Sequence, residues 1–203
     1  MALDPQPGNP DRSPALVVFD AMGVLYTTGD DVAALLIPYL RELGCSLLDT
    51  AIRDLYRDAS LGRMTSAAFW TVCGVAGDDA DFCARHHLTP GIDTLLADLR
   101  RRGIPLACLS NDVSEWSRLL RERFGLDRFI DTWVISGDIG VRKPDPAAYA
   151  ALAEATRVSP ARMVFLDDKQ VNVDAARAAS LDAIVFTGVA PAREALRARG
   201  LLP

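Results

Sequence analysis

Acidic, hydroxyl, amide and ammonium side chains follow four short apolar runs of the chain. In chain order they belong to Asp20, Ser110, Asn111, Lys143, Asp167 and Asp168. Carboxylates gathered at one place repel one another unless a cation lies among them, and hard oxygen ligands of this kind suit magnesium. A hydroxyl, an amide and an ammonium nearby could together bind a dianionic phosphoryl group and the charge that develops during its transfer.

The apolar runs have the composition of buried parallel strands, because they are short, continuous and rich in β-branched residues. The predicted strands cover residues 15–19, 104–109, 132–136, 163–166 and 183–186. Amphipathic or alanine-rich segments that predict helices lie between them, at residues 94–102, 115–124, 147–156 and 173–179. This alternation predicts an α/β fold with a Rossmann-like, three-layer core in which helices cover both faces of a parallel sheet.

Ligands of such a sheet bind outside the carboxyl ends of the strands, so the six polar residues are expected to meet at one edge. Each of them alone would be typical of a turn, a helix cap or a solvated loop. Their joint occurrence, in this order and after successive strands, favours a common site.

A long stretch without a predicted strand separates the first strand from the second. Its patterns predict helices at Val32–Leu43, Asp49–Ala59 and Thr65–Val72, and Pro90-Gly91 indicates the return to the sheet. The simplest account is an inserted all-helical cap. The predicted domains are a flexible tail at 1–14, a core at 15–29 and 89–203, and a helical cap at 30–88.

Composition narrows the classes of partner. The formal net charge of −5, with acidic and basic residues interspersed, offers no basic surface for nucleic acid, so no nucleic-acid partner is expected. The four cysteines lack the spacing of a zinc site. No apolar run approaches the roughly 20 residues that span a bilayer, and the proline-rich start has no apolar signal core. We therefore expect no membrane partner and a cytoplasmic protein.

Four ordered segments resemble the motifs of the haloacid dehalogenase superfamily. They are Val18-Phe19-Asp20-Ala21-Met22-Gly23-Val24-Leu25, Leu109-Ser110-Asn111, Lys143-Pro144-Asp145-Pro146, and Phe165-Leu166-Asp167-Asp168 with Asn172-Val173 behind it. The resemblance covers nearly the whole chain from Ala15 to Gly188. It implies a hydrolase with a small helical C1-type cap.

The resemblance also implies how the first and fourth segments work. Asp20 would attack the substrate and form an aspartyl intermediate. Magnesium, the implied cofactor, would be held by Asp20, Asp168 and the backbone carbonyl of Met22.

The remaining matched residues would bind or orient the reacting group. Ser110 and Lys143 would contact the group that is transferred. Asp167, the third implied catalytic residue with Asp20 and Lys143, would orient Lys143 or metal-bound water. Asn111 could contact the substrate phosphate or cap the helix that follows it. The cap would supply substrate selectivity and exclude water.

Position 22 departs from the pattern of the superfamily's usual phosphatases. They resemble this chain but carry an Asp there, which protonates the leaving oxygen and later activates water. A thioether cannot exchange a proton usefully, so the general acid-base contribution, typically about 10²–10⁴-fold, should be missing unless another group supplies it. The candidate replacements are Asp30, Asp31, His86 and His87, although Asp30 could instead cap a helix and the histidines could form a polar hinge.

Three functions follow from these residues. The preferred one is a magnesium-dependent phosphatase that acts on a small phosphorylated metabolite through an aspartyl-phosphate intermediate. The second keeps the Asp20 nucleophile but acts on an activated leaving group of the acyl phosphate, C–P or C–halogen type. The acidic pair Asp167-Asp168 argues against dehalogenation, and the absence of lysine from the cap argues against C–P cleavage. The third is a non-catalytic homologue that binds a ligand or partner.

The sequence predicts neither the substrate nor the oligomeric state. An apolar face with Tyr39, Phe69 and Trp70 could pair two subunits into a homodimer. The same spacing is also typical of a cap's own core.

Overall fold

The computed structural model describes residue 14 and residues 16–203, so nearly all of the predicted tail at 1–14 lies outside the described residues. Five parallel strands form one sheet in the order β3-β2-β1-β4-β5. The strands are β1 (Leu16–Phe19), β2 (Leu106–Ser110), β3 (Thr132–Ile135), β4 (Met163–Asp167) and β5 (Asp182–Val185). Each lies within two residues of its predicted position, and the predicted α/β class is confirmed.

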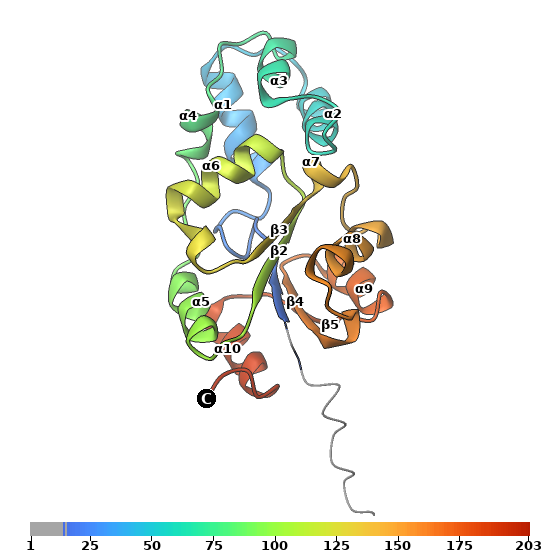
Figure 1. Ribbon diagram of the computed structural model, residues 1–203. Coiled ribbons are helices and arrows are strands. Elements are labelled where there is room, and N and C mark those ends of the chain that lie inside the picture. Colours follow the sequence, from blue (N-terminus) through green and yellow to red (C-terminus); the bar gives the residue numbers. More distant parts are fainter. Residues whose placement is uncertain (1–13, 15) are drawn as a thin grey trace, which may run out of the picture.

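The two faces of the sheet are buried by different helices. In β1, Val17 and Phe19 belong to one apolar cluster, and Leu16 and Val18 belong to the other, because successive side chains of a strand point to opposite faces. Figure 1 shows α5 (Ile92–Arg101), α6 (Ser114–Phe124) and α10 (Val189–Arg197) on one side of the sheet. On the other side lie α8 (Pro146–Thr156) and α9 (Gln170–Ala178), so the core has three layers.

Three shorter elements complete the core. They are α7 (Ser136–Ile139) and the 3-10 turns η3 (Leu126–Arg128) and η4 (Pro160–Arg162). α10 and these short turns were not predicted. None of the helices in the described part of the chain is long and apolar enough to cross a membrane.

Between β1 and α5 the chain forms helices that stand above the carboxyl edge of the sheet in Figure 1, and we call residues 30–88 the insertion. The helices are η2 (Val32–Leu36), α1 (Ile37–Glu42), α2 (Asp49–Ala59), α3 (Ser66–Val72) and α4 (Asp79–Cys83). The single helix predicted at Val32–Leu43 is a π-helical segment followed by an α-helix. Thr65 caps α3, because its side chain accepts a hydrogen bond from the Ala68 amide.

The insertion is joined to the core through an aromatic cluster. Trp116 of α6 lies with its ring centroid 4.6 Å from that of Phe82 and 5.3 Å from that of Trp70. The carboxylate of Asp79 accepts hydrogen bonds from the indole nitrogens of Trp70 and Trp116, both at 2.7 Å, and from the Ser66 hydroxyl at 2.6 Å. One carboxylate therefore connects α3, the start of α4 and α6.

The apolar residues considered for a homodimer are inside the molecule. Tyr39, Phe69 and Trp70 are each at most 5% exposed and contact one another or Phe82. They form the insertion's own core, which was the other reading of their spacing, and they do not form an exposed face for a second subunit.

Candidate active site

The strand register brings the predicted residues to one edge of the sheet. Phe19 pairs with Cys108 of β2 and with Leu166 of β4, so the residues that follow these positions leave the sheet together. Asp20 comes directly after β1, whereas Ser110 and Asp167 are the last residues of β2 and β4. This is the edge at which an open parallel sheet binds its ligands.

Asp20, Lys143 and Asp167 form a buried ion-paired triad. The Lys143 Nζ atom lies 2.7 Å from Asp20 Oδ1 and 2.7 Å from Asp167 Oδ2. All three side chains are at most 6% exposed. Because breaking a buried charge pair leaves an uncompensated charge, this arrangement fixes the ammonium between the two carboxylates.

The Asp167 carboxylate is fully occupied by contacts within the protein. Besides Lys143, it accepts hydrogen bonds from the Asn172 amide at 3.0 Å to both oxygens and from the Lys169 backbone N–H at 2.8 Å. These contacts suit a residue that orients Lys143. Asn172 was not among the predicted site residues, although its position on the first turn of α9, five residues after Asp167, was a usable signal.

Asn111 has a role that neither sequence interpretation included. Its side-chain nitrogen donates to the Lys143 carbonyl at 2.8 Å, and its side-chain oxygen accepts from the Lys143 backbone N–H at 2.8 Å. The amide therefore clasps the backbone of the residue that carries the ammonium. Ser110 is buried, and its Oγ has no hydrogen-bond partner among the described residues, so this hydroxyl could still serve a ligand.

Charge is unbalanced in the triad and its neighbourhood. Burial raises the pKa of Asp20 to about 7, against the opposing effect of Lys143 and with the help of Asp167 and Asp168. Burial alone would lower the pKa of Lys143, but the adjoining carboxylates outweigh it and raise the pKa. Burial also raises the pKa of Asp168. Lys143 and Lys169 supply two ammonium groups against the three carboxylates, and a divalent cation would relieve the remaining negative charge.

The residues at this edge fit a magnesium ion. One oxygen each from Asp20, Asp167 and Asp168 lies within 4.8 Å of the others, and Asp168 Oδ1 is buried with no hydrogen-bond partner in the described part of the chain. A Cβ atom at Gly23 or Gly29 would come within 2.5 Å of the Asp168 carboxylate, so only glycine leaves room for it. Since Asp167 is occupied by its own partners, Asp20 and Asp168 are the side chains available to hold the ion.

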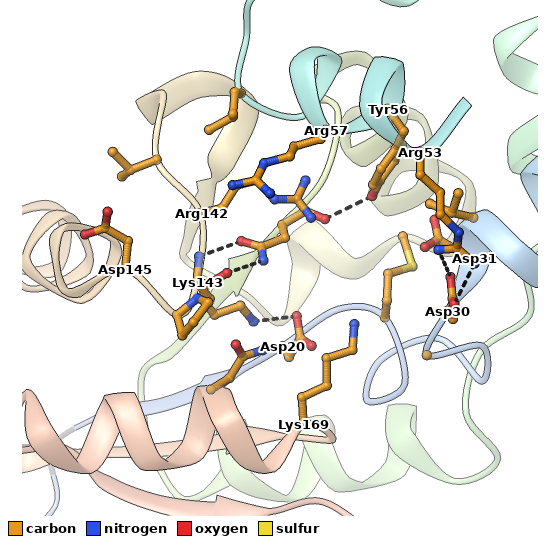
Figure 2. A pocket seen from close by; sticks show the side chains of 18 of the residues that line it. Asp20, Asp30, Asp31, Arg53, Tyr56, Arg57, Arg142, Lys143, Asp145 and Lys169 are labelled. Carbon is orange, nitrogen blue, oxygen red and sulfur yellow. Dashed lines mark hydrogen bonds and ion pairs between the residues drawn. The ribbon is translucent and has the colours of Figure 1, made fainter. Parts of the chain in front are cut away.

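A cavity of about 780 Å³ opens above the triad, between the core and the insertion. Asp20, Met22, Asn111 and Lys143 line it, whereas Ser110, Asp167 and Asp168 do not. In Figure 2 Lys143 and Asp20 point toward each other, and Lys169 rises beside them. Lys143 and Lys169 are the only two lysines of the chain, and both line this cavity.

The four candidate replacements for an acid at position 22 differ in their contacts and in their exposure. Asp30 pairs with Arg53 at 3.2 Å, and its Oδ1 accepts from the Ala33 amide, so it acts as a helix cap. His87 is exposed. Asp31 and His86 are buried together, with Asp31 Oδ2 3.9 Å from His86 Nε2, and neither atom has a hydrogen-bond partner among the described residues. Asp31 lines the cavity, whereas His86 does not.

Sequence relatives include enzymes of phosphoryl chemistry. The phosphoglycolate phosphatase of Pseudomonas putida is 28% identical over 194 residues, which cover 88% of this chain and 71% of that enzyme. The tyrosine-protein kinase PtkA of Mycobacterium tuberculosis is 28% identical over 192 residues, which cover 87% of this chain and 63% of that protein.

Solved structures share the fold, and a family model covers most of the chain. An enzyme of the haloacid dehalogenase (HAD) family from Bacteroides thetaiotaomicron, solved in complex with magnesium and inorganic phosphate, superposes on this chain with a TM-score of 0.70. At 17% sequence identity, with 87% of this chain and 96% of that chain covered, the likeness shows the fold alone. The model of haloacid dehalogenase-like hydrolases matches residues 14–180. The chain therefore belongs to the haloacid dehalogenase-like hydrolases.

Proposed function

We propose that the protein is a magnesium-dependent phosphatase that acts on a small phosphorylated metabolite through an aspartyl-phosphate at Asp20. The observation that carries this proposal is the buried triad of Asp20, Lys143 and Asp167 at the base of the cavity, next to Asp168, whose Oδ1 atom has no hydrogen-bond partner among the residues described. The fit of the Asp20 and Asp168 side chains to a hard divalent cation supports the cofactor. The backbone carbonyl of Met22 is proposed as a further ligand from the resemblance of the first motif.

The chain's own residues divide the work of phosphoryl transfer. An oxygen of Asp20 forms a bond to phosphorus while the bond from phosphorus to the leaving oxygen breaks, and water later cleaves the aspartyl-phosphate to restore the carboxylate. Lys143 faces the negative charge of the phosphoryl oxygens, and the Ser110 hydroxyl is available to donate to the same group. Bound magnesium would neutralise part of the phosphoryl charge. Asp167, Asn172 and Asn111 keep the ammonium in place.

Position 22 sets the limit of this chemistry. The Met22 side chain is 5% exposed and lines the cavity, and it cannot give a proton to the leaving oxygen or take one from water. Both protons then have to be exchanged with solvent or with another group. Rates on simple alkyl phosphates should therefore be low, and rates should rise as the leaving group becomes less basic.

This observation favours a second candidate function within the same site. The leaving group of an acyl phosphate is a carboxylate that needs no proton on departure, so an enzyme with Met22 would lose little in the transfer of the phosphoryl group to Asp20, although hydrolysis of the aspartyl-phosphate would still lack a base. Asp20 would remain the nucleophile, and Lys143 would keep its role.

The proposal also covers the role of the insertion and the cellular location of the protein. We propose that residues 30–88 act as a cap domain that supplies selectivity and excludes water from the intermediate, since α2 contributes one wall of the cavity. A cytoplasmic location is supported by the four cysteines, which are all free and buried.

Phosphate release tests the function directly. The protein is incubated with magnesium and a panel of sugar phosphates, phosphorylated carboxylic acids, nucleotides and acyl phosphates, and Asp20→Asn is the matched control. We expect release from at least one class by the native protein and none by the variant. Beryllium fluoride should bind with magnesium to the native protein alone, as seen by ¹⁹F NMR. No release from any class, together with no fluoride adduct, would contradict the proposal.

A further inference from the structure

We propose that the cavity selects phosphorylated substrates that carry a second anionic group, and that the guanidinium groups of Arg57 and Arg142 bind this group. The inference deepens the proposed function, because it rests on Asp20 and Lys143 for the phosphoryl end. It assigns the insertion side of the same cavity to a carboxylate or a second phosphoryl group.

Arg142 is held in the cavity wall by neutral groups. Its guanidinium donates to the Ser60 hydroxyl of the insertion and lies with its central carbon 5.5 Å from the Tyr56 ring centroid. Tyr56 in turn donates to the Asn111 carbonyl at 3.1 Å. No carboxylate in the described part of the chain pairs with Arg142. The side chain is therefore positioned, and the buried carboxyl group of Asp112 acts on its charge from beyond ion-pair distance.

Arg57 is the second cation without a partner. It lies on the last turn of α2, and its guanidinium forms no hydrogen bond or ion pair with the residues described. Asp54 lies three residues earlier on the same helix, lines the cavity and does not pair with it. Figure 2 shows the Arg57 and Arg142 side chains reaching into the cavity on the side of the insertion, above Asp20 and Lys143.

The neighbouring arginines behave differently. Arg53, one turn earlier on α2, pairs with Asp30 at 3.2 Å, and Arg63 pairs with Asp58 at 2.7 Å. Both line the same cavity, so the insertion can neutralise a cavity arginine where no ligand charge is needed.

The guanidinium of Arg57, from the insertion, and that of Arg142, from the core, reach into the same part of the cavity in Figure 2, and the repulsion between them is relieved when an anion lies between them. The planar guanidinium also matches carboxylate and phosphate oxygens with two parallel hydrogen bonds. The Ser60 hydroxyl joins the two residues, because it accepts from Arg142 and donates to the Arg57 carbonyl at 3.0 Å. An arrangement of this kind is suited to a ligand anion.

Three phosphonates that phosphoryl transfer cannot cleave separate this inference from turnover. Propylphosphonate has a neutral tail, phosphonopropionate has a carboxylate, and ethylenediphosphonate has a second phosphoryl-like group. Binding of each to the native protein is measured by titration calorimetry with saturating magnesium. We expect at least one of the two charged-tail probes to bind roughly tenfold or more tightly than propylphosphonate, the ratio expected for one charge-assisted contact.

Matched variants assign the preference to the two arginines. Arg57→Gln and Arg142→Gln should each reduce the ratio to less than about threefold while leaving propylphosphonate affinity within about threefold of native. Arg57→Lys should restore only part of the ratio, because an ammonium lacks the bidentate fork. Arg63→Gln removes an equal charge from the same wall and should leave the ratio unchanged. Circular dichroism checks that each variant is folded.

The outcomes are distinct from those of the proposed function. Tighter binding of phosphonopropionate would identify a carboxylate as the preferred second anionic group, and tighter binding of ethylenediphosphonate would identify a second phosphoryl group. Equal affinity for the neutral and charged tails overturns the inference, even if the protein releases phosphate. A preference that both glutamine variants retain also overturns it. An arginine-dependent preference in a protein without phosphate release would support the inference and contradict the phosphatase.

Discussion

The cavity has a core wall, formed by residues outside 30–88 such as Asp20 and Lys143, and an insertion wall, formed by residues 30–88. The two walls differ in how their charged side chains are held. On the core wall, Lys143 is buried, and each of its carboxylate partners lies 2.7 Å away. On the insertion wall, Arg53, Arg57 and Arg63 are exposed, and at most one carboxylate holds each of them. The charges on the first wall are fixed before a ligand arrives, whereas those on the second can adjust to it.

The difference indicates a division of labour. Fixed charges need no reorganisation during a reaction, which suits the wall where bonds form and break. Exposed arginines contribute little to stability, so their identity can follow the substrate with little effect on the fold. Substitutions on the two walls should therefore have effects of very different size.

The largest effect is expected at the nucleophile. Asp20→Asn keeps the shape of the side chain but removes the oxygen that forms the covalent bond to phosphorus. The rate of phosphate release should fall by at least about 10⁴-fold. Steady-state assays with magnesium measure this loss, and Arg63→Gln serves as the control. A fall of less than tenfold would show that Asp20 is not the nucleophile.

Lys143→Met tests whether the core wall depends on its shared cation. The activity should fall by about 10²–10³-fold, because the charge that faces the phosphoryl group is lost. The variant should also be less stable by about 3–5 kcal/mol near neutral pH, since two buried carboxylates lose their partner. Urea unfolding measures this loss. It should be smaller at about pH 5, where the Asp20 carboxyl can take up a proton. Equal losses at both pH values would contradict the assigned electrostatics.

Met22→Asp tests the missing proton transfer. The value of kcat/KM, which reports phosphoryl transfer to Asp20, should rise by up to about 10²-fold for alkyl phosphates and change by less than about threefold for acyl phosphates. A linear free-energy plot of kcat/KM against leaving-group pKa should be steep for the native protein and flatter for the variant. Met22→Leu is the matched control. If the native plot is already flat, another residue supplies the proton, and Asp31 is the buried carboxylate of the cavity to substitute next.

The affinity for magnesium should fall as the pH is lowered below about 7, because of the raised pKa of Asp20 on the core wall. The metal binds the ionised carboxylate, and the pKa of Asp20 is raised to about 7. Protons therefore compete below that pH, and the apparent affinity should fall about tenfold per pH unit from about 7 to 5. An unperturbed Asp, with a pKa of about 3.9, would give a nearly flat affinity over this range. Calorimetry in two buffers of different ionisation enthalpy measures the proton release.

The smallest effect is expected for a paired arginine of the insertion. Arg63→Gln breaks only the exposed pair with Asp58. The free energy of unfolding should change by less than about 0.5 kcal/mol. A loss as large as that of Lys143→Met in the same urea experiment would remove the contrast between the two walls.

The sequence alone predicted the sheet and the core wall well. The strands are continuous apolar runs, and the polar residues that end them meet because parallel strands share one edge. The helix Asp49–Ala59 was predicted with its observed bounds, owing to its strong apolar period. α4 was missed because five residues are too few to show that period. α10 was missed because Pro191 near its start weakens the helical pattern.

The contacts on the insertion side could not be predicted from local patterns. The approach of Asp31 to His86 joins residues that are 55 positions apart, and nothing around either one signals the other. In the same way, the sequence does not show that Arg53 and Arg63 find carboxylates while Arg57 does not. The difference depends on which side chains the folded insertion brings within reach.

The carboxylate of Asp79 has a mechanical consequence for the site. It ties α3 and the start of α4 to Trp116, and α6, which carries Trp116, begins at Ser114, four residues after Ser110. Lifting the insertion away from the sheet would break these hydrogen bonds or pull on α6 and the short loop that carries Asn111. Opening of the cavity and the position of Lys143 are therefore coupled through the carboxylate of Asp79.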